Sequence, residues 1–231
     1  ENSMKMLVYA DTIVNDEKVD LKLKQPFTRR NFYRDLAVLA YPTLKSEKLD
    51  FNKKPIITSS DENFNATLVI DKNSKTESEI KGKNSWVQFD YRKPHTIQSL
   101  FMEVKDRWAS AELLASNDGV NFKLVKDLFK QKTVHHKLDF FDHFEPVTAR
   151  FFRINFNRVT VIREINLMAT YTIGNFISRI GLNRIDDERL SDIGNPGSDM
   201  IIDPKTIINL TAYMDTNGNL KTTLPKGDYT I

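Results

Sequence analysis

Three of the four histidines of this chain lie in one short stretch together with two aspartates, and that composition could bind a metal ion or move a proton. The residues are His135, His136, Asp139, Asp142 and His143. Adjacent residues of a strand point to opposite faces, so the two neighbouring histidines cannot bind one ion without a bend. We therefore interpret the stretch as a surface strand and loop.

Motifs of known catalytic centres are missing from the sequence. There is no HExxH, no GxSxG and no phosphate-binding loop. The lack of cysteine excludes a disulfide framework, a thiolate zinc site and a cysteine nucleophile. Glycosidase chemistry needs two carboxyl groups held across a cleft, and no such pair stands out among the 31 acidic residues. We predict no catalytic residues in this chain and no glycosidase activity by the chain alone.

An aromatic residue in a polar loop is the best candidate for ligand binding. Trp108 lies in the loop Lys105–Ser110, where its ring could stack on the apolar face of a sugar. Trp86 opens an alternating strand, and we interpret it as a structural residue.

Charge and hydropathy exclude two classes of partner. The 34 basic and 31 acidic residues are interspersed, whereas a nucleic-acid-binding protein concentrates its positive charge on one face. No apolar run approaches the ~20 residues that span a bilayer, so we expect no membrane insertion. Residues 1–6 do not have the pattern of a signal peptide.

Hydrophobic alternation predicts an antiparallel β-sandwich in the centre of the chain. Strands are expected over 86–91, 97–104, 111–116, 122–128, 150–156 and 161–171, with turns at Lys93-Pro94, Asn117-Asp118-Gly119 and Glu145-Pro146. In the last of these strands, Val161 is expected on the same face as Ile165 and Leu167.

The flanks predict a smaller unit. Residues 5–14 and 36–41 have strand patterns, 174–190 have a helical stripe, and 206–210 with 220–224 flank the hairpin signal Asn217-Gly218. Because the chain ends where a strand begins, we expect it to be part of a longer protein.

The central motifs resemble those of galactose-binding-like domains, the group of discoidin, coagulation-factor C-type and family 32 carbohydrate-binding modules. The matching segments, in order, are Ile57–Ser60, Ala66–Thr76, Ser85–Tyr91, Leu114–Phe122, Ala149–Ile154 and Ile162–Ile165, with Lys72 where glycine is usual. The resemblance implies a jelly-roll sandwich over residues 46–172.

Such domains often hold a structural calcium ion where a loop meets the last strand. Carried over by resemblance, the calcium ligands are Asp71, Asn73 and Thr76 of the loop and Glu164 of the strand. No other cofactor is implied.

The flanking motifs resemble those of family 106 glycoside hydrolases, the α-L-rhamnosidases. The segments are Arg29–Pro42 and, near the end, Ile207–Thr211 and Leu224–Ile231. The resemblance implies a β-sandwich insertion in an enzyme whose catalytic barrel lies elsewhere in the same polypeptide, which acts on plant-type polysaccharide and is periplasmic or extracellular. The expected fold is thus all-β: the sandwich, plus a smaller unit of 1–45 with 173–231 that contains one short helix and pairs 36–41 with the C-terminal hairpin.

Three functions remain open at this point. The chain could be an accessory, non-catalytic region of a glycoside hydrolase, a carbohydrate-binding module in its own right, or a discoidin-type adhesion module. The last normally uses exposed apolar residues beside basic ones, for which Phe64 with Lys72 and Lys75 is the nearest match.

Overall fold

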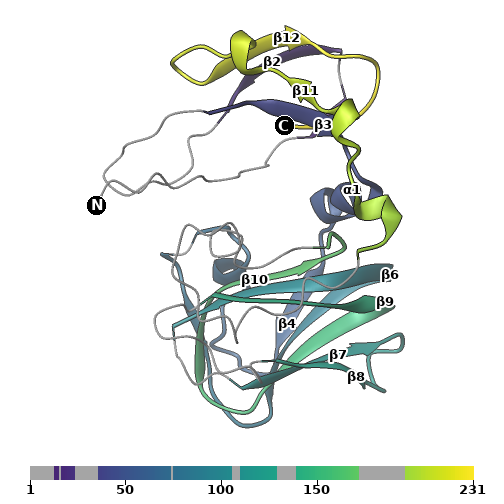
Figure 1. Ribbon diagram of the computed structural model, residues 1–231. Helices are drawn as coiled ribbons and strands as arrows, with labels where there is room; N and C mark the ends of the chain where they lie inside the picture. The colour runs from purple at the N-terminus through teal and green to yellow at the C-terminus, as the bar shows by residue number, and fades with distance from the viewer. Residues whose placement is uncertain are drawn as a thin grey trace, which may run out of the picture. The chain divides into compact units, whose positions relative to one another are not determined.

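The structure is a computed structural model that describes residues 13–15, 17–23, 36–73, 75–105, 110–128, 139–171 and 196–231. It divides into two compact units, Glu1–Lys48 with Pro196–Ile231 and Leu49–Asn195, and each is described by itself (Figure 1). In the described part of the chain, no helix has the length and apolarity needed to cross a membrane.

The larger unit is an antiparallel β-sandwich, as the alternation predicted. Its strand order is β5-β10-β6-β9-β7-β8, and β4 also pairs with β6. The bounds are β4 Ile56–Ser59, β5 Ser78–Ile80, β6 Ser85–Val104, β7 Ala111–Ser116, β8 Lys123–Leu128, β9 Asp139–Phe156 and β10 Thr160–Met168, with a 3-10 turn η2 at Ala66–Val69.

Two of the predicted turns, at Lys93-Pro94 and Glu145-Pro146, are bulges inside the long strands β6 and β9. The first half of β6 pairs with β4 and with the end of β9, and its second half pairs with β10 and with the start of β9. The register between β6 and β9 shifts between Asp90 and His95 and again between Ile97 and Ser99. Pro94 and Pro146 lie in these irregular segments, where a missing N–H breaks no ladder bond. Both strands therefore continue from one layer of the sandwich to the other.

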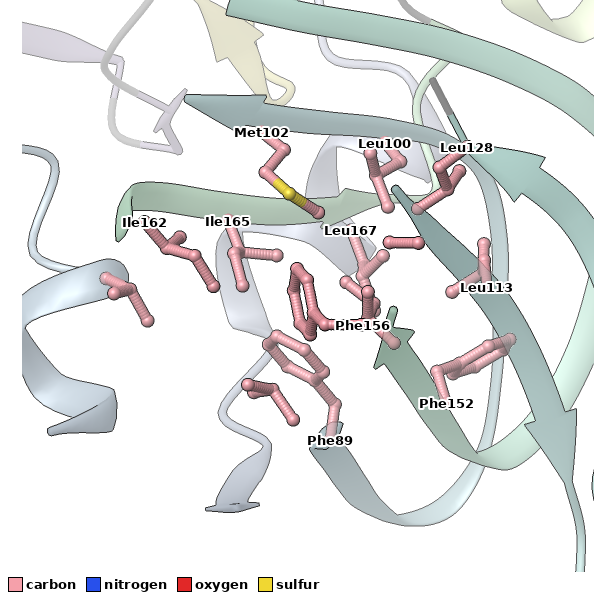
Figure 2. Packing of buried hydrophobic residues seen from close by; sticks show 14 of the residues in the cluster. Phe89, Leu100, Met102, Leu113, Leu128, Phe152, Phe156, Ile162, Ile165 and Leu167 are labelled. Carbon is pink, nitrogen blue, oxygen red and sulfur yellow. The ribbon is translucent and has the colours of Figure 1, made fainter. Parts of the chain in front are cut away.

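The core lies between the layers and is built from the inward residues of the long strands. Phe152, Ile154 and Phe156 of β9 are fully buried, as the alternation predicted, and Figure 2 shows Phe152 and Phe156 among the side chains of this core. The prediction for β10 was partly wrong. A register shift between Ile162 and Glu164 changes the face of the strand, so Ile162, and not Val161, joins Ile165 and Leu167 in the core.

A charged contact ties the two ends of the sandwich together. The helix α1, Lys45–Asn52, was not predicted from the sequence, and its Asp50 carboxylate accepts hydrogen bonds from the backbone N–H groups of Ala169 (2.7 Å) and Thr170 (2.8 Å). Lys53 lies 3.3 Å from the same carboxylate and donates to the side-chain oxygen of Asn166 at 2.6 Å. The helix predicted over 174–190 lies outside the described residues.

The smaller unit is built from both ends of the chain. One sheet has the order β1-β13-β3-β11, and β12 pairs with β2. The bounds are β1 Ile13–Val14, β2 Lys18–Lys22, β3 Leu39–Pro42, β11 Ile208–Asn209, β12 Asn219–Thr223 and β13 Tyr229–Thr230, with short 3-10 turns at Ser198–Met200, Pro204–Thr206 and Thr211–Tyr213.

The C-terminal hairpin differs from its prediction. Gly218 does lie in a tight turn, with φ of 81°, but the two arms do not pair with each other along their length. The first arm supplies β11, which pairs with β3, and the second supplies β12, which pairs with β2. Both arms bury a leucine, Leu210 and Leu220, in one core with Val19, Val38 and Ala40.

One buried imidazole stands at the bend of β6. His95 is 8 % exposed and stacks on Tyr91, with ring centroids 4.1 Å apart. Its Nε2 is the one buried side-chain nitrogen or oxygen without a hydrogen-bond partner among the described residues. Burial lowers the pKa of His95, and the ammonium groups of Lys53 and Lys93 lower it further, against the opposing effect of Asp50. The neutral imidazole is therefore the form that fits the fold.

We expect the Asp50→Asn substitution to destabilise the sandwich by about 3 kcal/mol, because it leaves the Lys53 ammonium half-buried without its counter-ion. Urea unfolding followed by tryptophan fluorescence measures this change. Glu62→Gln, which neutralises an exposed acid of the same unit, should change the unfolding free energy by less than about 0.5 kcal/mol. Equal effects of the two substitutions would contradict the role of Asp50.

The contribution of His95 to the stability of the sandwich should fall as the pH falls below about 6.5, the ordinary pKa of histidine, whereas Glu164, whose pKa burial raises to about 7, acts in the opposite sense in this pH range. The unfolded chain binds a proton at His95 that the folded chain resists, so protonation favours unfolding. His95→Phe keeps the ring against Tyr91 and removes the unpaired nitrogen. We expect the unfolding free energy of this variant, measured from pH 8 to 5, to change less with pH than that of the unmodified chain. The difference in slope should correspond to at most one proton. If the two proteins show the same pH dependence, His95 is not the cause.

Candidate functional site

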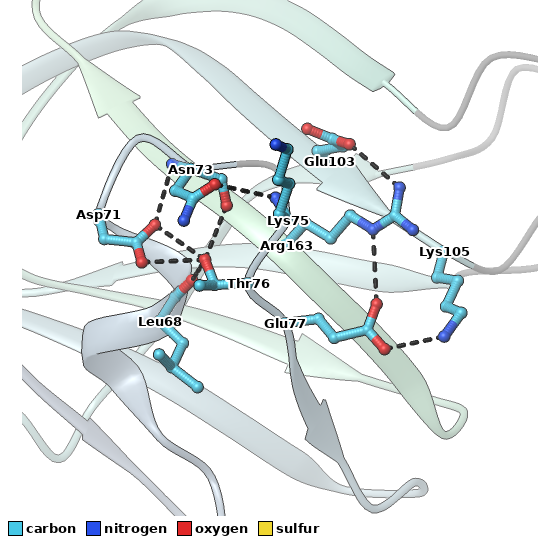
Figure 3. Close-up of polar contacts among 9 residues, drawn as sticks. All are labelled: Leu68, Asp71, Asn73, Lys75, Thr76, Glu77, Glu103, Lys105 and Arg163. Carbon is cyan, nitrogen blue, oxygen red and sulfur yellow. Dashed lines mark hydrogen bonds and ion pairs between the residues drawn. The ribbon is translucent and has the colours of Figure 1, made fainter.

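The loop between η2 and β5 gathers oxygen atoms around one hydroxyl group. The Thr76 hydroxyl oxygen lies 3.0 and 2.9 Å from the two carboxylate oxygens of Asp71. It also lies 2.7 Å from the carbonyl oxygen of Asn73 and 3.2 Å from that of Leu68 (Figure 3). Four acceptor oxygens thus surround a group that has a single proton to donate.

That arrangement fits a cation. The Thr76 hydroxyl can donate to one of these acceptors, while the Asn73 N–H donates to an Asp71 carboxylate oxygen at 2.9 Å and the Thr76 N–H donates to the Asn73 carbonyl at 3.0 Å. Lone pairs of these oxygens remain that a cation could use. Calcium binds six to eight oxygens, and it accepts carboxylate, carbonyl and hydroxyl ligands together. The side-chain oxygen of Asn73 accepts a hydrogen bond from the N–H of Lys75 at 3.2 Å, so the Asn73 carbonyl is the group that faces Thr76.

The last strand brings a second carboxylate to the loop. Glu164 of β10 accepts a hydrogen bond from the N–H of Lys72 at 3.1 Å. Burial raises the pKa of Glu164 to about 7, and the neighbouring carboxylates of Asp71 and Glu103 raise it as well, against the Lys72 N–H. The bulge that precedes Glu164 turns its side chain away from the core. A nearby cation would stabilise the ionised form of Glu164.

Lys72 adopts the backbone conformation that its position requires, although glycine is usual there. Its φ is 59°, in the left-handed region where a side chain costs about 1 kcal/mol. This conformation directs the N–H of Lys72 at Glu164.

Ion pairs hold the same edge of the sandwich in place. Arg163 lies between Glu77, at 3.5 Å, and Glu103, at 3.4 Å, and Lys105 approaches the other oxygen of Glu77 at 2.8 Å (Figure 3). The described residues contain no group of three or more histidine, cysteine, aspartate or glutamate side chains placed to hold a metal ion. A cation at this edge would therefore need carbonyl and hydroxyl oxygens in addition to carboxylates.

The structure thus brings together all four residues that the resemblance assigned to calcium. Trp108 lies outside the described residues, as do His135 and His136. His143 is part of β9, with its ring 4.8 Å from that of Tyr171. Phe64 is buried in the core of the sandwich, so it is not an exposed apolar side chain of the kind that a discoidin-type adhesion module uses.

The outward face of the sandwich carries aromatic rings and arginines that the sequence analysis missed. The guanidinium of Arg153 lies between two rings, 4.5 Å from the centre of Trp86 and 3.8 Å from that of Phe122. Arg150 forms two hydrogen bonds of 2.9 Å with the carboxylate of Asp90. The signal was the alternation of 150–156, which places Arg153 opposite the buried face of β9.

Two concavities of the sandwich are lined without aromatic residues. One, of about 390 Å³, is bordered by polar side chains that include Asp61 and Lys81. The other, of about 490 Å³, lies beside the turn at Asp118 and is bordered by residues of β7, β8 and β9. Neither offers a ring on which a sugar could stack.

Comparison with known proteins identifies the class of the sandwich. Residues 55–170, just over half of the chain, match the F5/8 type C domain family, and the chain belongs to that family. The resemblance to galactose-binding-like domains is therefore confirmed at the level of fold, as an all-β sandwich.

Similar proteins include large enzymes. The structure of a rhamnosidase from Novosphingobium sp. PP1Y is similar over 95 % of this chain and 22 % of its own, with 19 % identity and a TM-score of 0.65. The Clostridium perfringens protein CpGH89CBM32-6 matches 52 % of this chain and 96 % of its own, with 22 % identity and a TM-score of 0.46. A Formosa agariphila protein named "Putative beta-glucuronidase" is 45 % identical over 56 residues. That alignment covers 22 % of this chain and 5 % of the relative, so the chain spans a small part of its length.

Proposed function

We propose that this chain is a non-catalytic β-sandwich region of a glycoside hydrolase that resembles α-L-rhamnosidases. In this proposal the region supports a catalytic barrel of the same polypeptide and binds plant-type polysaccharide outside the cytoplasm. The sandwich, residues 46–172, is inserted in a smaller unit of 1–45 with 173–231.

One observation carries the proposal. The rhamnosidase similarity extends over 95 % of the chain and so includes the smaller unit as well as the F5/8 type C domain. An independent binding module would need no second sheet shared by both ends of the chain. The pairing of β3 with β11 and β13 supports an insertion, since an inserted domain leaves its host strands to pair across it.

Two other functions differ from it in testable ways. A carbohydrate-binding module acting alone would bind glycan through the loop of Trp108, because the two concavities described above have no aromatic lining. A discoidin-type adhesion module would bind lipid surfaces, and the burial of Phe64 removes the residue that the sequence offered for this role.

A structural calcium ion completes the proposal. Asp71, Thr76 and Glu164 would supply side-chain oxygens, and Leu68 and Asn73 would supply carbonyl oxygens. Calcium would neutralise the carboxylates and fix the loop against β10; it takes no part in a reaction here.

We expect the purified chain to be retarded by pectic polysaccharide in affinity electrophoresis and to release no product from an aryl α-L-rhamnoside. Trp108→Ala should weaken the affinity for the polysaccharide by about tenfold or more, because stacking on an aromatic ring supplies a large part of the free energy of sugar binding. The variant should therefore be retarded less. Tyr213→Ala, which removes an exposed ring of the smaller unit, is the matched control.

Different results would select different functions. Hydrolysis that is lost on substituting one acid of this chain would overturn the non-catalytic assignment. Sedimentation with anionic liposomes, without retardation by any polysaccharide, would favour the adhesion module.

Calcium should raise the melting temperature of the chelator-treated protein, with stabilisation of about 2.7 kcal/mol at a hundredfold excess over the dissociation constant. Asp71→Asn should abolish this shift. Asp61→Asn is the control, because Asp61 also accepts a backbone N–H in its own loop, from Asn63 at 3.0 Å, yet lies outside the oxygen cluster. A melting temperature that calcium leaves unchanged, with no heat in calorimetry, would show that the loop needs no cation.

A further inference from the structure

The guanidinium of Arg153 is held rigidly but has no carboxylate partner among the described residues. Its Nε and Nη2 both donate to the side-chain oxygen of Gln88, at 3.0 and 2.6 Å, and its Cζ lies 4.5 Å from the centre of the Trp86 ring and 3.8 Å from that of Phe122. Two other arginines of the sheet differ: Arg150 pairs with Asp90, and Arg163 pairs with Glu77 and Glu103. Arg153 is thus a fixed cation whose Nη1 edge is not used within the described chain.

This arrangement is unusual for the outward face of a sheet. Alternation directs Val87 and Phe89 into the core and leaves Trp86 and Gln88 outside, where polar side chains are the norm. Both rings and the arginine are half-buried, so the face is neither core nor an ordinary solvated surface. Burial lowers the pKa of Arg153, which reflects the cost of partly desolvating a cation without an anion beside it.

We propose that Arg153, between Trp86 and Phe122, is a binding site for the carboxylate of a uronic acid residue in a glycan. A guanidinium presents paired donors in one plane, which match a carboxylate, and the adjacent rings offer apolar edges to the C–H groups of a pyranose. A neutral sugar can place its C–H groups against the rings, but it has no carboxylate for the guanidinium. We therefore expect the site to prefer acidic glycans. The inference rests on the proposed polysaccharide-binding function and names a ligand class and a face for it.

Gln88 offers a sharp test. Gln88→Glu keeps the shape of the side chain and places a carboxylate against Nε and Nη2 of Arg153 from within the chain, so the charge of the guanidinium is neutralised before any ligand arrives. We expect this variant to stay folded and to bind tetragalacturonate at least about tenfold more weakly than the unmodified chain in isothermal titration calorimetry.

Arg153→Gln should have the same effect by removing the cation. Arg158→Gln removes the same charge from an exposed arginine of the sandwich, and it should bind as the unmodified chain does. Melting temperatures of all variants separate loss of binding from loss of fold. Neutral galactotetraose should bind more weakly than tetragalacturonate, and its affinity should be the same with Gln88→Glu.

The outcomes distinguish this inference from the function on which it rests. If tetragalacturonate and galactotetraose bind alike, and neither Gln88→Glu nor Arg153→Gln changes the affinity, Arg153 is a packing residue and the polysaccharide-binding function stands. If the chain binds neither these oligosaccharides nor any polysaccharide, both are overturned. If Arg158→Gln weakens binding as much as Arg153→Gln, the attraction is diffuse and the site is refuted.

Discussion

The bend shared by β6 and β9 is the constraint on which the sandwich depends. Both strands shift register at the same place, and this lets each of them pair in one layer with its first half and in the other with its second. The bend has a local cost, because Arg92 takes a φ of 63° and His95 is buried with an unpaired nitrogen. The large aromatic and aliphatic core between the layers offsets that cost.

The polar edges of the sandwich follow from the same geometry. A bulge in β10 turns Glu164 toward the loop of Asp71, while Ile162 and Ile165 stay in the core. Oxygen atoms of this loop then gather around the Thr76 hydroxyl, and a cation could use their remaining lone pairs. The Asp50 carboxylate, in contrast, has several donors, from Lys53 and from two backbone N–H groups.

The smaller unit explains why the chain is more than an F5/8 type C domain. Its sheet alternates strands from the beginning and the end of the chain, so neither end can form it alone. A buried core of valine, alanine and leucine side chains joins them. This sheet and its core lie outside residues 55–170, which match the F5/8 type C family.

The sequence by itself determined the fold class and several strands of the sandwich, because alternation in segments such as 150–156 reports directly which face is buried. It did not predict β2, β4 or β5. It also placed the four calcium candidates through motif order. It could not place the bulges, since a single extra residue changes the face of a strand without changing its composition, as at Val161 and Ile162. It missed α1 and the Asp50 contact, which join residues 119 positions apart. The tertiary structure alone decided that Arg153 lies between Trp86 and Phe122, because those three residues meet only when β6, β9 and the turn before β8 are assembled.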